Sequence, residues 1–371
     1  MVIPFMSLYL TTALGFTLTQ AGFVMGAYGL GSILGAYLGG ELTDRFGSYR
    51  VQLVSLAGGG TIVFSLIFLK SFESIVSAVF LFALISDTLR PANSVAVSHF
   101  SDESNRVRSF SLMRLAINLG FSIGPALGGL ISGMAGFKWI FLVDSITCFG
   151  ALYILKKYIP SSSVVIAETE KITPNSSSIA TAYKDYYYLI FIVLVMLYGT
   201  IFFQFFSSIP VFWKIGNSFN EIKIGLLLGL NGLLIALFEM PLVRWMQKKY
   251  PHYNTIPLAF GLLGISYICL MIPDFALPAA VLFIVLLSLS EMLSMPFMLN
   301  FSINRASEER KGQYMALYSI AYGLAHIAAP VVGMRYAERF GFDPLFVLLG
   351  CISLAGTISF WLFFRQNKKG Q

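Results

Sequence analysis

Eleven long apolar runs constrain this 371-residue chain more than any other feature of its sequence. A helix that crosses a bilayer needs about 20 apolar residues at a rise of about 1.5 Å each. The runs lie at about 22–41, 51–69, 75–97, 109–134, 139–155, 187–211, 222–243, 256–272, 277–299, 312–334 and 344–364. Ahead of them, residues 1–14 are apolar but reach only about 21 Å, less than the hydrocarbon thickness of about 30 Å. We therefore predict an all-α polytopic membrane protein with twelve spans, the first of them incomplete in this sequence.

Composition and missing motifs exclude several other classes of protein. Only 12% of the residues are charged, about half the share in soluble domains, and the apolar content excludes a disordered chain. The sequence contains no GxxxxGK[ST] loop, HExxH or GxSxG, which argues against a nucleotide-driven pump and against an enzyme. Cys148, Cys269 and Cys351 lie inside apolar runs and fit neither a disulfide framework nor a zinc site. We expect no cofactor and no metal.

The Lys and Arg residues between the spans predict the orientation of the chain. Seventeen of the 25 lie on the side that holds the 2–3, 4–5, 6–7, 8–9 and 10–11 loops and the C-terminus, and six lie on the other side. Cytoplasmic loops carry such an excess. We therefore expect a multi-pass protein of the plasma (inner) membrane with a cytoplasmic C-terminus. The same bias explains the pI near 9.2 without any nucleic-acid partner.

A polar segment and an internal repeat divide the chain into two halves. We predict a six-span bundle at 1–155, a cytoplasmic linker at 156–185 and a second six-span bundle at 186–371, because residues 160–185 are Ser-rich and mixed in charge. A shift of 205 residues places Pro91 on Pro296, Pro125 on Pro330 and Gly128 on Gly333. Parallel repeats of this kind are related by a pseudo-two-fold axis along the membrane normal, with the substrate site between the halves.

The loop between spans two and three carries the most specific motif. It reads Gly40-Glu41-Leu42-Thr43-Asp44-Arg45-Phe46-Gly47-Ser48-Tyr49-Arg50. This sequence closely resembles the signature Gly-x-Leu-x-Asp-Arg-x-Gly-Arg-Lys of the major facilitator superfamily, from which Ser48 and Tyr49 depart. The resemblance implies the fold of that superfamily. It also implies that Gly40, Asp44, Arg45, Gly47 and Arg50 form a conformational lock that closes one face of a transporter.

A second motif, in span five, resembles the antiporter motif of proton-driven drug efflux members. It consists of small residues and a proline: Gly120, Gly124, Pro125, Gly128 and Gly129. Small residues let membrane helices approach closely, and proline weakens a helix where it bends. Tight packing without any role in transport direction is the alternative interpretation. The segment from Leu84 to Pro91 in span four also resembles the family motif that contains an intramembrane arginine.

Three intramembrane charges are the candidates for proton coupling. Asp87 and Arg90 are three residues apart on one helix face, so they can pair. The superfamily fold places Glu291 of span ten opposite them across a central cavity. Intramembrane carboxylates mark proton pathways, so we expect Glu291 to exchange the proton while Asp87 and Arg90 respond. A neutral ion pair that only fixes packing, and a Glu291 held protonated in the helix bundle, are the alternatives.

The remaining polar residues of the spans are candidates to line the cavity or contact substrate. They are Arg90, Arg114, Asn118, Gln204, Asn231, Tyr322 and His326. Arg114 can instead snorkel to the cytoplasm, and His326 can serve packing alone.

Together these features predict a secondary transporter that works by alternating access. We expect proton-coupled efflux of amphipathic, drug-like compounds, with a small-molecule substrate, the proton and the lipid bilayer as partners and a monomer as the working form. Proton-coupled uptake of a sugar, peptide or organic anion is the alternative within transport. A non-transporting, truncated relic or membrane scaffold is the alternative outside it.

Overall fold

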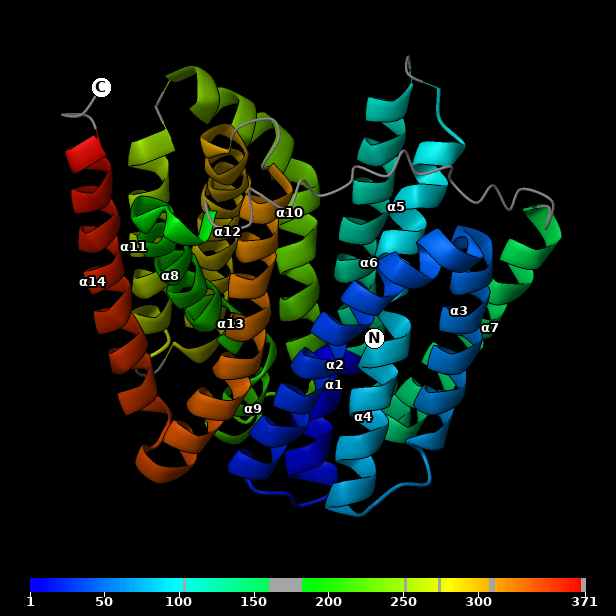
Figure 1. Ribbon diagram of the computed structural model, residues 1–371. Coiled ribbons are helices and arrows are strands. Elements are labelled where there is room, and N and C mark those ends of the chain that lie inside the picture. The colour runs from blue at the N-terminus through cyan, green and yellow to red at the C-terminus, as the bar shows by residue number, and fades with distance from the viewer. Residues whose placement is uncertain (103–104, 160–181, 250–251, 273–274, 307–310, 368–371) are drawn as a thin grey trace.

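The computed structural model describes residues 1–102, 105–159, 182–249, 252–272, 275–306 and 311–367, and in these the regular elements are all helices. They form two bundles that stand side by side (Figure 1). The N-terminal bundle contains α1 (Val2–Leu8), the π-helical η1 (Tyr9–Ala13), α2 (Leu18–Phe46), α3 (Ser48–Ser65), α4 (Phe72–Ser86), α5 (Leu89–His99), α6 (Arg106–Ala135) and α7 (Phe137–Tyr158). The C-terminal bundle contains η4 (Ala182–Lys184), α8 (Tyr186–Phe202), η5 (Phe203–Phe206), α9 (Ser208–Ile215), α10 (Glu221–Lys249), α11 (His252–Cys269), α12 (Ala276–Arg305), α13 (Lys311–Phe340) and α14 (Phe342–Asn367).

The all-α prediction is confirmed, and the predicted apolar runs are helical. Nine segments of the described residues are long and apolar enough to cross a membrane. Two shorter apolar helices, Val2–Ala13 and Asn254–Cys269, accompany them, and α3 covers most of the run predicted at 51–69. Residues 160–181 of the predicted linker lie outside the described residues.

Two spans that the sequence predicts as uninterrupted are broken in the structure. The run at 75–97 breaks at Asp87 and Thr88 between α4 and α5, and the run at 187–211 breaks at η5 between α8 and α9. In each case a proline, Pro91 or Pro210, is the third residue of the helix after the break. Proline has no N–H and its ring collides with the carbonyl group four residues earlier, so a continuous helix fails at both points.

Glycines hold α2 against α4 and α5 at a distance that no side chain allows. Gly31, Gly35 and Gly39 are spaced by four residues on one face of α2. A Cβ atom on Gly35 would lie 2.4 Å from the carbonyl oxygen of Leu84, and one on Gly31 would lie 2.4 Å from that of Phe80. The N-terminal bundle therefore depends on a small-residue stripe of the kind that drives helix packing in lipid.

The two bundles contact each other in a crosswise pattern. The second span of the N-terminal bundle (α2) packs on the fifth of the C-terminal bundle (α13), and the fifth of the N-terminal bundle (α6) packs on the second of the C-terminal bundle (α10). This exchange is what a pseudo-two-fold axis requires. The equivalent helices α6 and α13 also have 30 residues each and carry their prolines, Pro125 and Pro330, at the same register.

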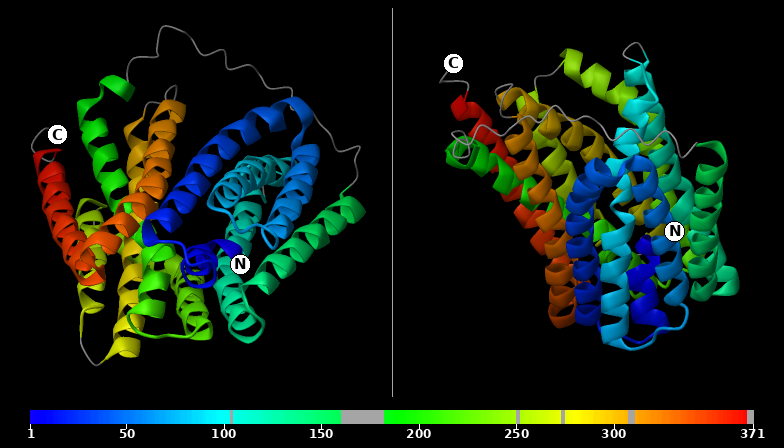
Figure 2. Two further views of the ribbon diagram at one scale, coloured as in Figure 1. Left: turned by 90° about the horizontal axis from the view of Figure 1, so that it is seen from below. Right: turned by 45° about the vertical axis from the view of Figure 1, so that its right-hand side comes forward.

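The contact between α2 and α13 is close on one side of the molecule. A Cβ atom on Gly22 would lie 2.5 Å from the carbonyl oxygen of Pro330, and the Thr19 N–H donates to the Glu338 carboxylate at 2.5 Å. Both contacts involve the first turns of α2, which lie against α13 between the bundles in the view from below (Figure 2). Toward the top of Figure 1 the bundles diverge. The molecule is therefore closed at the predicted external end.

One carboxylate ties three helices of the C-terminal bundle together. Asp185 accepts two hydrogen bonds of 2.7 Å from Arg305 of α12 and one of 2.9 Å from the Tyr314 hydroxyl of α13. It also caps α8 by accepting from the Tyr188 N–H at 3.1 Å. Burial alone raises the pKa of Asp185, but these hydrogen bonds outweigh burial and leave its pKa below the ordinary value.

The glycine stripe predicts which glycine substitutions destabilise the protein. Gly35→Ala should lower the free energy of unfolding by about 1–3 kcal/mol, because the new methyl group collides with backbone. Gly150→Ala is the matched control, since a Cβ atom there meets nothing within 4 Å. Thermal unfolding in detergent compares the two, and equal melting temperatures would contradict the packing described here.

The lowered pKa of Asp185 predicts acid sensitivity. A carboxylate with a depressed folded pKa stabilises the protein fully above its unfolded value, near 3.8, and loses this contribution as the pH falls through the folded pKa. Asp185→Asn should therefore lower the melting temperature at neutral pH and flatten its decline in acid. The control is Asp343→Asn, at the exposed start of α14. Parallel melting curves for Asp185→Asn and the wild type would refute this prediction.

Candidate functional site

A cavity of about 550 Å³ lies where the two bundles face each other. Its walls come from α1, α2, α4, α5, α6, α7, η5 and α13. The ring-bearing residues that line it are Tyr28, Phe82, Phe121, Phe203, Phe206 and His326, and the polar side chains are Ser86, Arg90 and Asp144. An aromatic wall with few polar groups is typical of small-molecule sites.

His326 occupies a central position in this wall. Its ring stacks on Phe203, with 4.5 Å between the ring centroids, and meets Tyr28 edge-on at 5.7 Å. Phe203 belongs to the C-terminal bundle and Tyr28 to the N-terminal bundle. His326 therefore contacts rings from both walls of the cavity.

The predicted pairing of Asp87 with Arg90 is present at the break between α4 and α5. The Arg90 Nε lies 3.0 Å from the Asp87 Oδ1. The Asp87 carboxylate is buried, and its second oxygen has no hydrogen-bond partner among the described residues. The Arg90 side chain is 67% exposed and lines the cavity, so it keeps hydrogen-bond donors free for a solute.

Glu291 hydrogen-bonds within its own bundle and is not among the residues that line the cavity. The family resemblance predicts that it faces Asp87 and Arg90 across the cavity. In the structure its carboxylate accepts a hydrogen bond of 3.3 Å from the amide of Asn231, and Asn231 also donates to Ser288 at 3.0 Å. Among the described residues no ion pair joins Glu291 to Asp87 or Arg90. Helix α10 of the same bundle, rather than the opposite bundle, provides the hydrogen-bond partner of Glu291.

A second charged pair crosses between the bundles. Arg114 of α6 forms an ion pair with Glu239 of α10, and the Asn118 side chain lies next to Glu239. Glu239 is buried, whereas Arg114 is about half exposed. Arg114 and Asn118 therefore point toward the other bundle, and Glu239 pairs across the molecule rather than with Arg244 of its own helix.

Two of the predicted cavity residues pack within the C-terminal bundle. Gln204 is buried; it donates to the Ala329 carbonyl at 2.7 Å and accepts from the Ser208 hydroxyl at 2.5 Å, so it holds the broken seventh span against α13. The Tyr322 hydroxyl donates to the sulfur of Met298 at 3.9 Å. Neither side chain lines the cavity.

The antiporter-like motif forms part of the contact between α6 and α10. A Cβ atom on Gly129 would lie 2.7 Å from the Cα of Gly225. Gly128 faces Phe5, and Gly120 and Pro125 line the cavity. Gly124 lies near Met1. The motif thus serves both as cavity wall and as the close contact between bundles.

The predicted lock loop forms no ion pair and no side-chain hydrogen bond to the other bundle among the described residues. Gly47 has a φ of +81°, which suits glycine in the tight turn between α2 and α3. Arg45 pairs with Glu41 of its own helix at 3.8 Å, and Asp44 and Arg50 are exposed. Gly40 faces open space. The loop is therefore open in this conformation.

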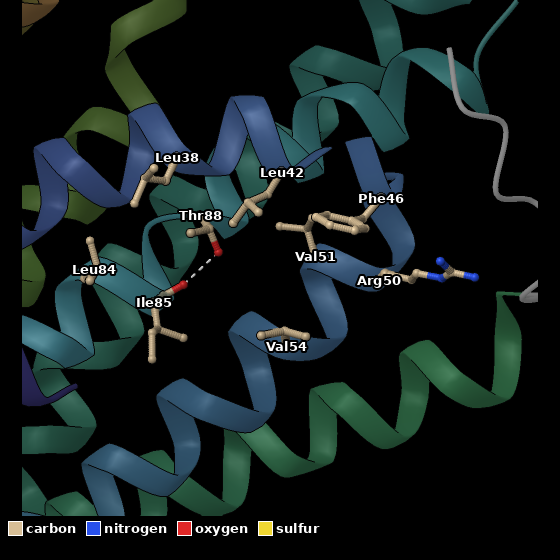
Figure 3. Close-up of a pocket in the computed structure, with 9 residues that line it drawn as sticks. All are labelled: Leu38, Leu42, Phe46, Arg50, Val51, Val54, Leu84, Ile85 and Thr88. Atoms are coloured by element: carbon tan, nitrogen blue, oxygen red, sulfur yellow. Dashed lines mark hydrogen bonds between the residues drawn. The ribbon is translucent and has the colours of Figure 1, made fainter. Parts of the chain in front are cut away.

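A separate groove of about 470 Å³ lies beside this loop, between α2, α3 and α4 (Figure 3). Leucine, isoleucine, valine and phenylalanine side chains make up most of its lining. Arg50 at its margin points away from them in Figure 3, and the Thr88 hydroxyl donates to the Ile85 carbonyl at 2.7 Å. The groove offers no free polar group for solute recognition.

Sequence reasoning missed several contributors to the cavity, among them Asp144 and Tyr28. Asp144 of α7 lines it and lies 3.5 Å from the Met1 amino group. A lone acidic residue inside the apolar run at 139–155 was the signal that could have found it. Tyr28 had no such signal, because an aromatic residue in a span faces lipid by default.

Comparison with known proteins agrees with this architecture. A sequence model described as Major Facilitator Superfamily matches residues 1–330. The chain belongs to the Major Facilitator Superfamily. It is therefore a membrane transporter, and the family resemblance inferred from its motifs is confirmed.

Individual members of the superfamily align over almost the whole chain. A Na(+), Li(+), K(+)/H(+) antiporter of Planococcus maritimus is 25% identical over 100% of this chain and 93% of its own length. The quinolone resistance protein NorA of Staphylococcus aureus (strain MRSA252) is 22% identical over 96% of this chain and 90% of its own. The crystal structure of the nucleoside transporter NupG matches with a TM-score of 0.83 over 98% of this chain and 94% of that one, at 15% identity, which supports the fold.

The open state of the lock loop predicts the effect of Asp44→Asn. If Asp44 stabilises a conformation that is closed at the cytoplasmic face, loss of its charge favours the open conformation seen here. The modification rate of a cysteine at Ser86, in the cavity, by an impermeant thiol reagent from the cytoplasmic side should rise at least about fivefold. The exposed Glu73→Gln at the opposite end is the control. If this cysteine is modified at the same rate in Asp44→Asn as in the wild type, from either face, Asp44 does not act as a lock.

Proposed function

We propose that this superfamily member is a proton-coupled exporter of small amphipathic compounds in the plasma membrane, with its C-terminus in the cytoplasm. The structure would then be the conformation open to the cytoplasm, because its bundles are in contact at the predicted external end. Solute enters the cavity between the bundles, and rocking of the bundles exposes it to the outside.

The environment of Glu291 is the main evidence for proton coupling. It is an intramembrane carboxyl whose hydrogen bond comes from a neutral amide, while the neighbouring cation Arg114 is already paired with Glu239. Acidic residues inside a membrane are costly and mark proton pathways. Glu291 forms no ion pair that would hold it permanently ionised, so a bound proton can neutralise it. Glu291 is therefore suited to bind and release one proton in each transport cycle.

The cavity supports an amphipathic substrate. Six of its sixteen lining residues carry aromatic rings, and the exposed donors of Arg90 and the carboxylate of Asp144 provide polar contacts at two points. A planar apolar molecule with a polar end can stack on His326 and Phe203 while its polar end meets one of these groups.

The quinolone resistance relative and the antiporter-like motif support export. The relative described as a Na(+), Li(+), K(+)/H(+) antiporter favours a second candidate, exchange of a monovalent cation for protons. Both candidate functions, export of organic compounds and exchange of a monovalent cation, use the proton as the coupling ion. They differ in the transported substrate, so one transport assay distinguishes them.

Proteoliposomes with an imposed pH gradient test the proposal. A quinolone, a lipophilic fluorescent cation, Na⁺ and K⁺ are offered in turn, and we expect the two organic compounds to move against the proton gradient. Movement of Na⁺ or K⁺ alone would favour cation exchange. Movement of the organic compounds together with protons would indicate uptake, and no counterflow of any compound would contradict transport.

Glu291→Gln should separate coupling from transport. The amide keeps the shape of the side chain and its hydrogen bond to Asn231 but cannot release a proton. Gradient-driven export should fall at least about tenfold while counterflow without a gradient stays within about threefold. Driven export at the wild-type rate would remove Glu291 from the mechanism.

A further inference from the structure

The stripe along which α6 and α10 touch leads to a cluster of charges. Ser122 of α6 donates its hydroxyl to the Gly229 carbonyl at 3.0 Å, and a Cβ atom on Gly232 would lie 2.6 Å from the Ser122 nitrogen. Such close approach leaves no room for side chains. One and two turns further toward the predicted cytoplasmic end, Asn118 and Arg114 continue the same face of α6.

At this end the small residues give way to the ion pair between Arg114 and Glu239. The Glu239 side chain is 11% exposed, whereas that of Arg114 is 53% exposed. The pair therefore lies where the close contact between bundles ends, with the carboxylate enclosed and the guanidinium open on one side. Among the inter-helix ion pairs of the described residues that do not involve the chain terminus, this one alone joins the two bundles.

Helix α10 connects this pair to Glu291. Asn231 and Glu239 are eight residues apart, so they lie on similar faces two turns from each other. Asn231 donates to the carboxylate of Glu291 of α12, so one residue of α10 contacts Glu291 while another, Glu239, contacts Arg114. The other ionisable groups that face Glu291 are Tyr198 of α8 and Tyr322 of α13.

The charges of this cluster do not balance when all groups are ionised. The three groups comprise one guanidinium and two carboxylates, so together they carry one excess negative charge inside the membrane. Uncompensated charge there is costly. One proton, taken from water and returned to water, makes the cluster neutral, and because Arg114 belongs to the opposite bundle its pairing depends on the bundle positions.

We propose that Arg114, Glu239 and Glu291 form a single charge cluster across the bundle interface that holds one exchangeable proton. Arg114 is a positioning residue in this cluster. With the proton on Glu291, Arg114 pairs with Glu239 as observed. When Glu291 releases the proton, its carboxylate competes with Glu239 for Arg114 and loosens the contact between α6 and α10. This inference rests on the proposed proton coupling and adds its link to bundle movement.

A charge swap tests the cluster directly. Arg114→Gln and Glu239→Gln should each lower gradient-driven export at least about tenfold, because either change alters the charge that the proton balances. The double variant Arg114→Glu/Glu239→Arg keeps all three charges and should recover export to within about threefold of wild type. The control is Lys214→Gln, which removes the pair between Lys214 and Glu221 within one bundle and should leave export unchanged.

A structural measurement separates this proposal from the proposed function. Spin labels at Leu112 of α6 and Met240 of α10, both exposed, report the distance between bundles when Cys148, Cys269 and Cys351 are replaced by serine. The single variants should shift or broaden the distance distribution, and the swap should restore it. If the wild type transports no solute but the single variants still shift the distance between bundles, only the proposed function is overturned. Single variants with wild-type distances, or a swap as impaired as the single variants, would overturn the cluster.

Discussion

The close crosswise contact between the two bundles is the constraint on which the rest of the structure depends. In lipid, helices gain little from hydrophobic burial against each other, so association relies on small residues that allow backbones to touch. Gly22 on Pro330 and Gly129 on Gly225 provide such contacts at the two interfaces. These glycines bring backbone close to backbone at both interfaces.

The polar groups of the interior are arranged around this interface. Asp87 and Arg90 lie at the break in the fourth span, where the helix has lost its regular hydrogen bonds and a charged pair can face the cavity. Arg114 and Glu239 lie at the end of the contact between α6 and α10, and Glu291 hydrogen-bonds Asn231 two turns away on α10. The pairs Asp87–Arg90 and Arg114–Glu239 thus give charges that are costly in lipid a partner at the cavity or at the contact between the bundles.

The sequence predicts the fold in most respects, because bilayer thickness sets span length and the internal repeat sets the symmetry. It does not predict the breaks at Asp87 and at Phe203–Ser207, because other prolines, such as Pro125 and Pro330, remain inside continuous helices. The local pairing of Asp87 with Arg90 follows from a spacing of three residues. The hydrogen-bond partner of Glu291 does not follow from residue spacing, because it depends on how α10 is rotated against α12. Arg114 and Glu239 are 125 residues apart, and only tertiary packing brings them together.

The central claim is that the two bundles open alternately to the two faces of the membrane. Single-molecule energy transfer between dyes tests it, with one dye pair at the ends of α5 and α12 on the predicted cytoplasmic face and a second pair at the ends of α2 and α13 on the other face. When solute and a pH gradient are added, the account predicts that one distance shortens as the other lengthens. Distances that change together, or that stay fixed at both faces while solute crosses, would contradict it.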